Sequence, residues 1–365
     1  MNKIEIFFSS SLRDIEPTTM TSASNDYLSK QNPHPRDAHI HFDEGPHKYT
    51  IDGINGVTAD TVFTSVTTLV HQHFEHFDAK KIIAAMMRNQ KKWNDPVANA
   101  KYYGKTAEEI EQMWSDAGRD AATKGTAMHY DIECFYNTPP DADTAVAPDT
   151  NTATDTDVPA TAESLSCAPS SSDNQSNVVP PLGGGTPPEF KYFLKFNQEH
   201  VAGEATTLRP YRTEWTVFHE EARIAGSIDM VYEIVEPDTD ATAAAKSNVV
   251  APSRGGTPLA IYDWKRCKEI IKTNRAGKFA THPAIEHLPD TNFWHYALQL
   301  NIYKYILQTK YGKTVTDLYL IVLHPESQKY NRIKLPNLQT EVTELFEERI
   351  RHFSAQSVIA TATSE

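Results

Sequence analysis

The sequence predicts an α/β (α+β) fold, in which helices and strands share one core. Two low-complexity segments, 138–188 and 236–258, interrupt the chain, and without them the pattern runs helix, three strands, helix, strand. A hydrophobic content of 39%, with 10% aromatic residues, is enough for a substantial core. A length of 365 residues fits one large domain or two ordinary ones.

Cysteine usage and hydropathy indicate the compartment. The three cysteines show neither a CxxC pair nor zinc-ligand spacing, so we expect a reduced, intracellular protein of the nucleus or cytoplasm that is not secreted. No apolar run approaches the roughly 20 residues of a membrane span. The first 30 residues resemble neither a secretory signal nor a transit peptide, and we therefore expect no contact with a membrane.

The net charge of −13 is unevenly distributed along the chain. Residues 138–188 contain seven acids and neither Lys nor Arg, so the remainder of the chain carries −6. This balance argues against a large surface that coats DNA non-specifically, but not against a site built from carboxylates.

Composition also suggests the domain boundaries. The two low-complexity segments share a repeat, 176–187 and 247–258, with 9 of 12 positions identical, and we interpret both as related insertions in surface loops. The expected parts are a disordered N-terminal tail (1–36), strands and helices leading into the first core helix (37–137), an insertion (138–188), the core (189–354) with a second insertion (236–258), and a C-terminal tail (355–365).

The elements before the first insertion follow from local patterns. Residues 47–53 read as a strand closing in a turn, and the β-branched run 62–70 as another strand. A helix is expected over 78–88. A second is expected over 106–136, where Thr106 and Glu109 form a capping box and a Gly-Thr pair at 125–126 interrupts the apolar stripe.

The core elements come after the insertion. We expect a short helix, three strands, a helix, a strand and a closing amphipathic helix, over 190–200, 213–218, 224–235, 259–265, 292–309, 317–323 and 338–353.

The strand 259–265 ends in an acid, a spacer and a lysine. Asp263 and Lys265 project from the same face of a strand, whereas Trp264 points to the opposite face and is expected in the core. Such a pair can hold a divalent cation and steady an activated water, although an isolated D-x-K is usually an exposed ion pair.

Further polar motifs occur on the other elements in a fixed order. They are Gly125-x-x-x-His129-x-x-x-Glu133, Glu214, Gly226-Ser-Ile-Asp229, Asp263-x-Lys265 and Gln299-x-x-x-Tyr303. The combination resembles the PD-(D/E)XK nuclease superfamily. Within it, the chain is most similar to the RecB-like branch, which includes the mitochondrial genome maintenance exonucleases and many viral and phage exonucleases. The resemblance runs from about residue 39 to 353, the insertions excepted.

The resemblance implies a restriction-endonuclease-like core, with a central mixed β-sheet flanked by helices and an N-terminal β/helical extension. It also implies roles for individual residues. Asp229 and Asp263 correspond to the metal-binding acids, Lys265 to the lysine of the motif, His129 to a histidine of the metal shell, Gln299 and Tyr303 to the motif after the lysine strand, and Glu214 and Glu133 to outer acids.

The chemistry of these residue types agrees with that assignment. Carboxylate oxygens are preferred ligands of Mg²⁺ or Mn²⁺, and an imidazole somewhat favours Mn²⁺. Gln299 and Tyr303 lie one helical turn apart, so they can meet the same phosphate or nucleotide. Downstream, five basic residues either form a solvated charge run or contact DNA phosphates: Arg266, Lys268, Lys272, Arg275 and Lys278.

The chain departs from relatives that carry extra cofactors. Three scattered cysteines cannot supply a four-cysteine iron–sulphur cluster, so none is expected. The Gly-Lys-Thr sequences at 104–106 and 312–314 lack the earlier glycine of a phosphate loop, so no nucleotide cofactor is expected. Any helicase or recombinase partner would then be a separate protein.

These observations predict a metal-dependent DNA exonuclease acting in replication, repair or recombination. The inserted repeats suggest a large DNA virus in an infected host cell as its source. A structure-specific or restriction-like endonuclease on the same core is one alternative. A helical arch formed by 75–120 would confine a strand end and favours the exonuclease. A catalytically inactive nucleic-acid-binding module is the other alternative, and intact Asp229, Asp263 and Lys265 argue against it.

Overall fold

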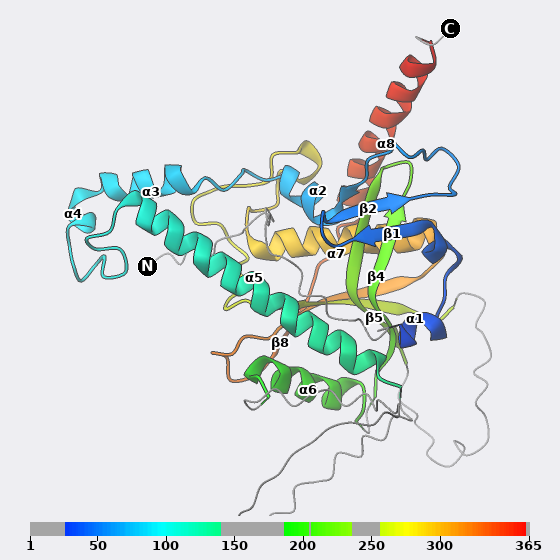
Figure 1. Cartoon of the computed structure of the whole chain (residues 1–365), viewed down its shortest axis with the longest axis horizontal. Helices are drawn as coiled ribbons and strands as arrows, with labels where there is room; N and C mark the ends of the chain where they lie inside the picture. The colour runs from blue at the N-terminus through cyan, green and yellow to red at the C-terminus, as the bar shows by residue number, and fades with distance from the viewer. Residues whose placement is uncertain (1–25, 140–185, 204–205, 236–255, 363–365) are drawn as a thin grey trace, which may run out of the picture.

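The structure is a computed structural model that describes residues 26–139, 186–203, 206–235 and 256–362 (Figure 1). The predictions for residues 1–25, for most of the insertions 138–188 and 236–258, and for the last three residues lie outside the described ranges. Within those ranges, no helix has both the length and the apolar composition needed to cross a bilayer.

A six-stranded mixed sheet forms the centre of the fold, as expected. Antiparallel pairing joins β4 to β5, β5 to β6 and β7 to β8, whereas β6 and β7 run parallel and β3 runs parallel to the start of β5. The strands are β3 (Thr64–Ser65), β4 (Leu208–His219), β5 (Ile224–Ile234), β6 (Leu259–Lys265), β7 (Val315–Val322) and β8 (Asn331–Lys334).

Two different strands share one edge of β5. Residues Ile224 and Ala225 pair with β3, and residues 230–233 pair with β6, so the segment 226–229 lies between the two pairings. This division of one edge of β5 between two strands is here called the fork of β5. It places the end of the Gly-Ser-Ile-Asp motif beside the end of β6. The opposite edge of β5 pairs with β4, but the register skips Glu214 and Asp229.

Helices cover both faces of the sheet (Figure 1). On one face pack α2 (Val66–Gln72), α7 (Asn292–Lys310) and α8 (Gln339–Ala362), which share a buried cluster with the inward side chains of β4 to β7. On the other lie α1 (Tyr27–Gln31), α5 (Ala107–Asn137) and α6 (Pro188–His200), packed on Tyr232, Tyr262 and Trp264. Trp264 is 1% exposed, which confirms its predicted place in the core.

The predicted strand over 62–70 is wrong beyond its first residues. Only Thr64 and Ser65 are extended, and α2 begins at Val66. The Ser65 hydroxyl accepts a hydrogen bond from the Thr68 amide at 3.0 Å and caps the helix. Val66, Leu69 and Val70 are buried at helical spacing, so the β-branched run had concealed an amphipathic helix.

The long helix predicted over 106–136 is confirmed. The capping box of Thr106 and Glu109 is present, and α5 continues without a break from Ala107 to Asn137. Gly125 is accommodated inside the helix, where glycine costs about 1 kcal/mol relative to alanine.

Residues 26–36 were expected to be loosely attached, but they pack on the body. Leu28 is buried, and its amide donates to the Asn137 side chain at 3.0 Å. A 3₁₀ turn, Pro35–His39, brings Arg36 to Glu220 at 2.6 Å. A hairpin of β1 (Ile40–Asp43) and β2 (Lys48–Ile51) follows, where the sequence predicted only a strand closing in a turn.

The helix predicted over 78–88 is present, and it belongs to a projecting part of the molecule that is here called the arm. The arm consists of α3 (Ala79–Arg88), α4 (Gln90–Trp93), the loop that follows, and the first turns of α5, and it extends away from the sheet (Figure 1). Its own small core contains Ile83, Ile110 and Trp114.

Candidate metal centre

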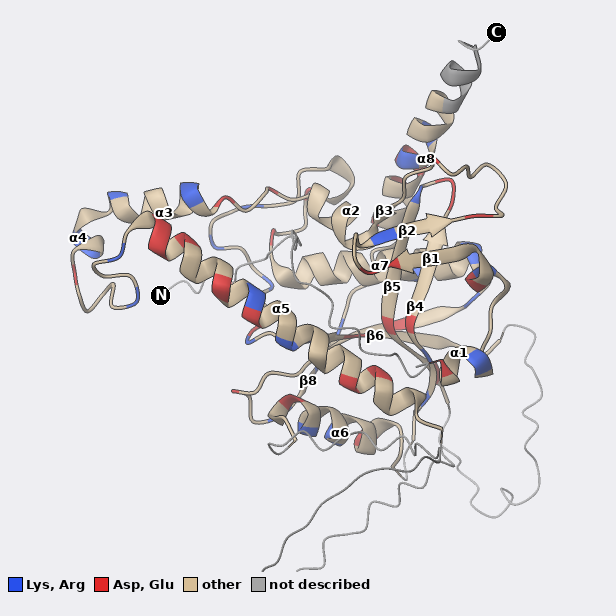
Figure 2. Cartoon of the chain, viewed as in Figure 1, with Lys and Arg blue, Asp and Glu red and all other residues tan. Residues whose placement is uncertain are grey.

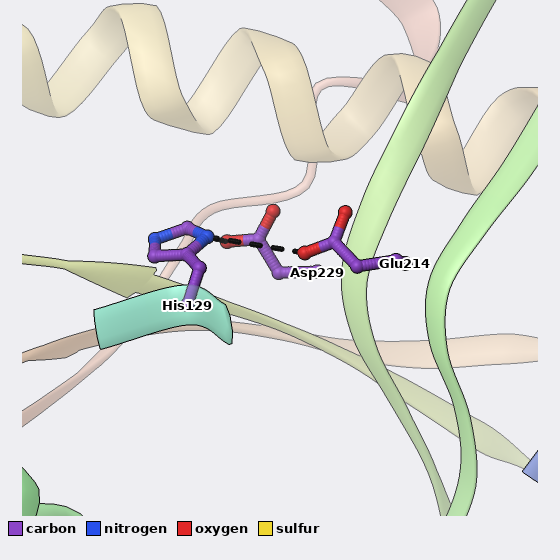
Figure 3. Close-up of side chains that lie close together, drawn as sticks. All are labelled: His129, Glu214 and Asp229. Atoms are coloured by element: carbon purple, nitrogen blue, oxygen red, sulfur yellow. Dashed lines mark ion pairs between the residues drawn. The ribbon is translucent and has the colours of Figure 1, made fainter. Parts of the chain in front are cut away.

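Three potential ligands from three different elements converge at the fork of β5. The His129 Nδ1 of α5 lies 3.6 Å from the Asp229 carboxylate of β5 and 3.9 Å from the Glu214 carboxylate of β4 (Figure 3). One ligand atom from each residue lies within 4.8 Å of the others. The structure therefore brings two predicted ligands, His129 and Asp229, together with Glu214, which was expected as an outer acid. Asp263, the third predicted ligand, pairs with Lys265 beside them.

The backbone of Trp264 orients two of these side chains. His129 Nε2 lies 2.8 Å from the Trp264 carbonyl, and the Trp264 amide donates to Asp229 Oδ2 at 3.1 Å. A carbonyl only accepts, so Nε2 carries the proton, and in the neutral ring Nδ1 presents a lone pair to the carboxylates. A lone pair facing two carboxylates is an arrangement that a cation stabilises.

Glu214 is held in an unusual backbone conformation. Its φ of 42° lies in the left-handed region, which costs a residue with a side chain of order 1–3 kcal/mol. The Ser227 hydroxyl donates to its carboxylate at 2.8 Å. Burial and the neighbouring Asp229 raise the pKa of Glu214 to about 8. The backbone strain and the raised pKa both indicate that holding this carboxyl group beside Asp229 costs the fold stability.

Asp263 and Lys265 form a close ion pair next to this cluster. Their charged atoms lie 2.6 Å apart, and Asp263 is 2% exposed. Burial and the nearby Asp229 raise the pKa of Asp263 to about 7. Burial opposes the charge on Lys265, but the carboxylates of Asp263 and Asp229 outweigh it and raise the pKa of the lysine. Lys265 also lies 4.8 Å from the centroid of the Tyr296 ring.

Gln299 and Tyr303 of α7 reach the centre in different ways. Gln299 and Lys265 line the same small cavity, of about 190 Å³, together with residues of α2. Tyr303 is buried and packs against Gly226, where an added Cβ would lie 2.9 Å from the tyrosine hydroxyl. Burial raises the pKa of Tyr303, so it remains a neutral phenol. Tyr303 therefore packs α7 on β5, and Gln299 faces the cavity.

The five basic residues after the lysine strand separate into two groups. Arg266 pairs with Glu189 at 2.6 Å, Lys278 pairs with Glu75 at 2.6 Å, and Lys268 pairs with Glu326. Lys272 and Arg275 are exposed, and the Lys272 ammonium lies 4.7 Å from the centroid of the Phe293 ring. These residues do not converge on the cluster.

Some contributors were not identified from the sequence. Ser227 and the Trp264 peptide act through hydrogen bonds that depend on which strands become neighbours, and no local pattern marks them. Tyr49 of β2 is buried near Glu214, and burial raises its pKa. Glu133 lies outside the ligand cluster, and burial raises its pKa as well.

A second group of potential ligands occurs at the turn between β4 and β5. It consists of His219, Glu220 and Glu221. Lys310 and Arg36 already pair with these carboxylates, so their charge is balanced without a cation.

The comparisons with known proteins add no assignment. No protein-family model matches the chain, and a search of curated proteins finds no significant match.

Proposed function

We propose that this chain is a metal-dependent deoxyribonuclease with a PD-(D/E)XK-type centre. The observation that carries the proposal is the convergence of His129, Glu214 and Asp229 beside the Asp263–Lys265 pair. Isolated D-x-K sequences are common, but here five residues from four elements meet at one fork of the sheet.

The donor set fits Mg²⁺ or Mn²⁺. Asp229 and Glu214 offer hard oxygen ligands, and the lone pair of His129 Nδ1 adds a nitrogen that favours Mn²⁺ somewhat. Asp263 Oδ2 is buried against the Lys265 ammonium at 2.6 Å, so Asp263 fixes the lysine beside these ligands. When bound, the cation would lower the pKa of a water and neutralise charge on the scissile phosphate.

The protein residues would orient the reacting groups. The Lys265 ammonium, kept charged by Asp263, offers N–H donors to the attacking water or to a phosphate oxygen on which charge develops. Gln299 offers an amide N–H from the adjoining cavity. In the reaction, a P–O bond to the water oxygen forms, the P–O bond to the neighbouring sugar breaks, and the leaving oxygen gains a proton.

The arm favours an exonuclease, acting in DNA replication, repair or recombination, over an endonuclease. Figure 2 shows Lys and Arg along α3 and α4. Residues 79–105 contain a single acid, Asp95, and seven basic residues, namely Lys80, Lys81, Arg88, Lys91, Lys92, Lys101 and Lys105. The first turns of α5 carry Glu108, Glu109 and Glu111, so the positive charge of the arm lies on α3, α4 and the loop. His129 lies fifteen residues beyond Trp114 of the arm on the same helix, about 22 Å along its axis. A basic projection at this distance can hold a strand whose end is in the centre.

The decisive experiment is digestion of end-labelled linear DNA, single- and double-stranded, beside a closed circle. It is run with Mg²⁺, Mn²⁺ or EDTA. We expect metal-dependent loss of linear DNA with the circle spared, and the position of the label then gives the direction. The Asp263→Ala variant should be inactive, whereas Asp317→Asn, which removes a sheet carboxylate paired with Lys334, should retain activity.

Other outcomes would change the assignment. Cutting of the circle would identify an endonuclease. Binding of DNA without cleavage in any metal would identify the inactive module, and full activity of Asp263→Ala would refute the proposed centre.

A further inference from the structure

A groove lies next to the centre, at the edge of the sheet where β6 and β7 end. It has a volume of about 470 Å³ and runs between the segment after β6, the end of β7 and the start of β8. Its walls include Lys268, Lys272, Ser327 and Asn331, and its apolar lining includes Ile270 and Ile333. The volume falls in the range of about 300–1,000 Å³ that is typical of ligand sites.

The position of the groove ties it to the centre. In sheets with parallel strands, ligands bind outside the carboxyl ends of the strands, and β6 and β7 are the parallel pair here. Lys268 is three positions after Lys265, so even an extended chain places their Cα atoms within about 10 Å. A stacked strand advances 3.4 Å per nucleotide, so the groove lies within roughly three nucleotides of Lys265.

The chemistry of the walls suits a phosphate backbone. Two ammonium groups and the side chains of Ser327 and Asn331 can all donate hydrogen bonds to phosphate oxygens. Glu326 pairs with Lys268 and Glu269 also lines the groove, so two acids balance the two lysines until a phosphate takes the place of Glu326 at Lys268. No aromatic side chain is among the lining residues of the described chain, which argues against base stacking as the mode of binding.

We propose that this groove binds the phosphate backbone of a single nucleic-acid strand next to the centre, through Lys268 and Lys272. The proposal rests on the proposed function, and names two of the five downstream basic residues as those that touch the substrate. Binding in the groove should not depend on the base sequence of the strand, because the contacts are to phosphates.

The test is the salt dependence of binding, measured in EDTA so that cleavage plays no part. A fluorescein-labelled oligothymidylate is titrated with the full chain between about 50 and 200 mM salt, and anisotropy gives the affinity. Each phosphate contact on a single strand contributes about 0.7 to the slope of log K against log[salt]. Lys268→Gln and Lys272→Gln should each lower the slope by about 0.7, and the double variant by about 1.4.

Matched variants separate a charge effect from a loss of structure. Lys272→Arg keeps the charge and should retain the slope. Lys30→Gln removes an exposed lysine of α1 that also pairs with an acid, Asp26, and should leave the slope unchanged. At 0.1 M salt each groove variant should bind about fivefold more weakly.

The outcomes distinguish this proposal from the proposed function. If the wild type binds and cleaves DNA but the groove variants have unchanged slopes, the groove proposal alone is overturned. Lowered slopes in a protein that never cleaves in any metal would support the groove and overturn the nuclease. Absence of binding by the wild type in EDTA would overturn the groove, and the digestion assay would decide the nuclease separately.

Discussion

At the scale of single residues, Glu214 shows how the centre is held against the preferences of the fold. Its backbone is left-handed, and its carboxyl group is forced next to Asp229. Since its pKa is about 8 in the folded state and 4.5 ordinarily, the folded state binds more protons between these values. The stability contributed by this proton is complete below pH 4.5 and is lost as the pH rises through 8.

The variant Glu214→Gln should therefore stabilise the metal-free protein at alkaline pH. The Glu214 side chain is about one third exposed, and solvent screening reduces the effect. With this allowance, we expect the free energy of unfolding of the variant to exceed that of the wild type by about 1–2 kcal/mol at pH 8 to 9. The gain in stability should vanish below pH 4.5, because Glu214 of the wild type is then protonated and is as uncharged as the glutamine of the variant. Urea unfolding in EDTA at the two pH values measures it. A variant less stable than wild type at pH 9 would contradict the prediction. Activity should fall about 10–100-fold.

At the scale of elements, two glycines of the sequence motifs have opposite environments. A Cβ at Gly226 would lie 2.9 Å from the Tyr303 hydroxyl and 3.0 Å from Val66, so it would separate β5 from α7 and α2. At Gly125 nothing lies within 4 Å of the added atom, and the residue is inside a helix.

We expect Gly226→Ala to lower the free energy of unfolding by about 1–3 kcal/mol through overpacking. Gly125→Ala should raise it by up to about 1 kcal/mol, and serves as the matched control. Both are measured by chemical denaturation. Adding Tyr303→Phe to Gly226→Ala removes one of the close contacts and should recover part of the loss, whereas strictly additive effects would argue against the contact.

The elements also show what the sequence could predict. The bounds of β6 were predicted correctly, because a continuous apolar run ends there in a polar motif. The run 62–70 was misread because its β-branched residues are compatible with either period until the Ser65 cap is known. β8 was missed because four residues with a single apolar side chain, Ile333, carry little signal.

The candidate site was predictable only in part for a related reason. His129, Asp229, Asp263 and Lys265 are side chains with distinctive chemistry, and the structure brings them together. The Trp264 peptide bonds to both His129 and Asp229, but a peptide group is the same at every position. Its role follows from the register between β5 and β6, which local sequence patterns do not specify.

At the scale of the whole molecule, the ends of the first insertion limit how it can be removed. Asn137, the last residue of α5, is buried and bonded to Leu28, and Pro188 begins α6, where Glu189 pairs with Arg266. A deletion of 138–188 would therefore remove the first residue of α6.

Replacing residues 141–185 by a short Gly-Ser linker should leave both the melting temperature and the nuclease activity close to wild type, because loop length changes free energy only slightly. Calorimetry and the digestion assay check this. Loss of folding in this deletion would show that the segment is not a tolerated insertion. The deletion of 138–188 should be less stable than the shorter one.

The continuity of α5 has a mechanical consequence. One rod carries the arm at its beginning, His129 in its second half and the buried Asn137 at its end. If the arm binds a strand and the centre binds a metal, bending of the arm would shift His129 on the same helix, and metal–ligand distances vary by only about 0.2 Å. Binding at the arm and binding at the metal centre would then be thermodynamically linked.

Linkage of this kind is reciprocal. If a bound oligonucleotide changes the affinity of the centre for Ca²⁺ as a non-catalytic probe, then Ca²⁺ must change the affinity for the oligonucleotide by the same factor. Paired titrations of the wild type and of Lys91→Gln/Lys92→Gln, which weakens the arm alone, measure the two factors. In the wild type we expect each ligand to change the affinity for the other a fewfold or more, and in the variant we expect a smaller change. Affinities that are independent of one another in the wild type would show that the two sites are not coupled.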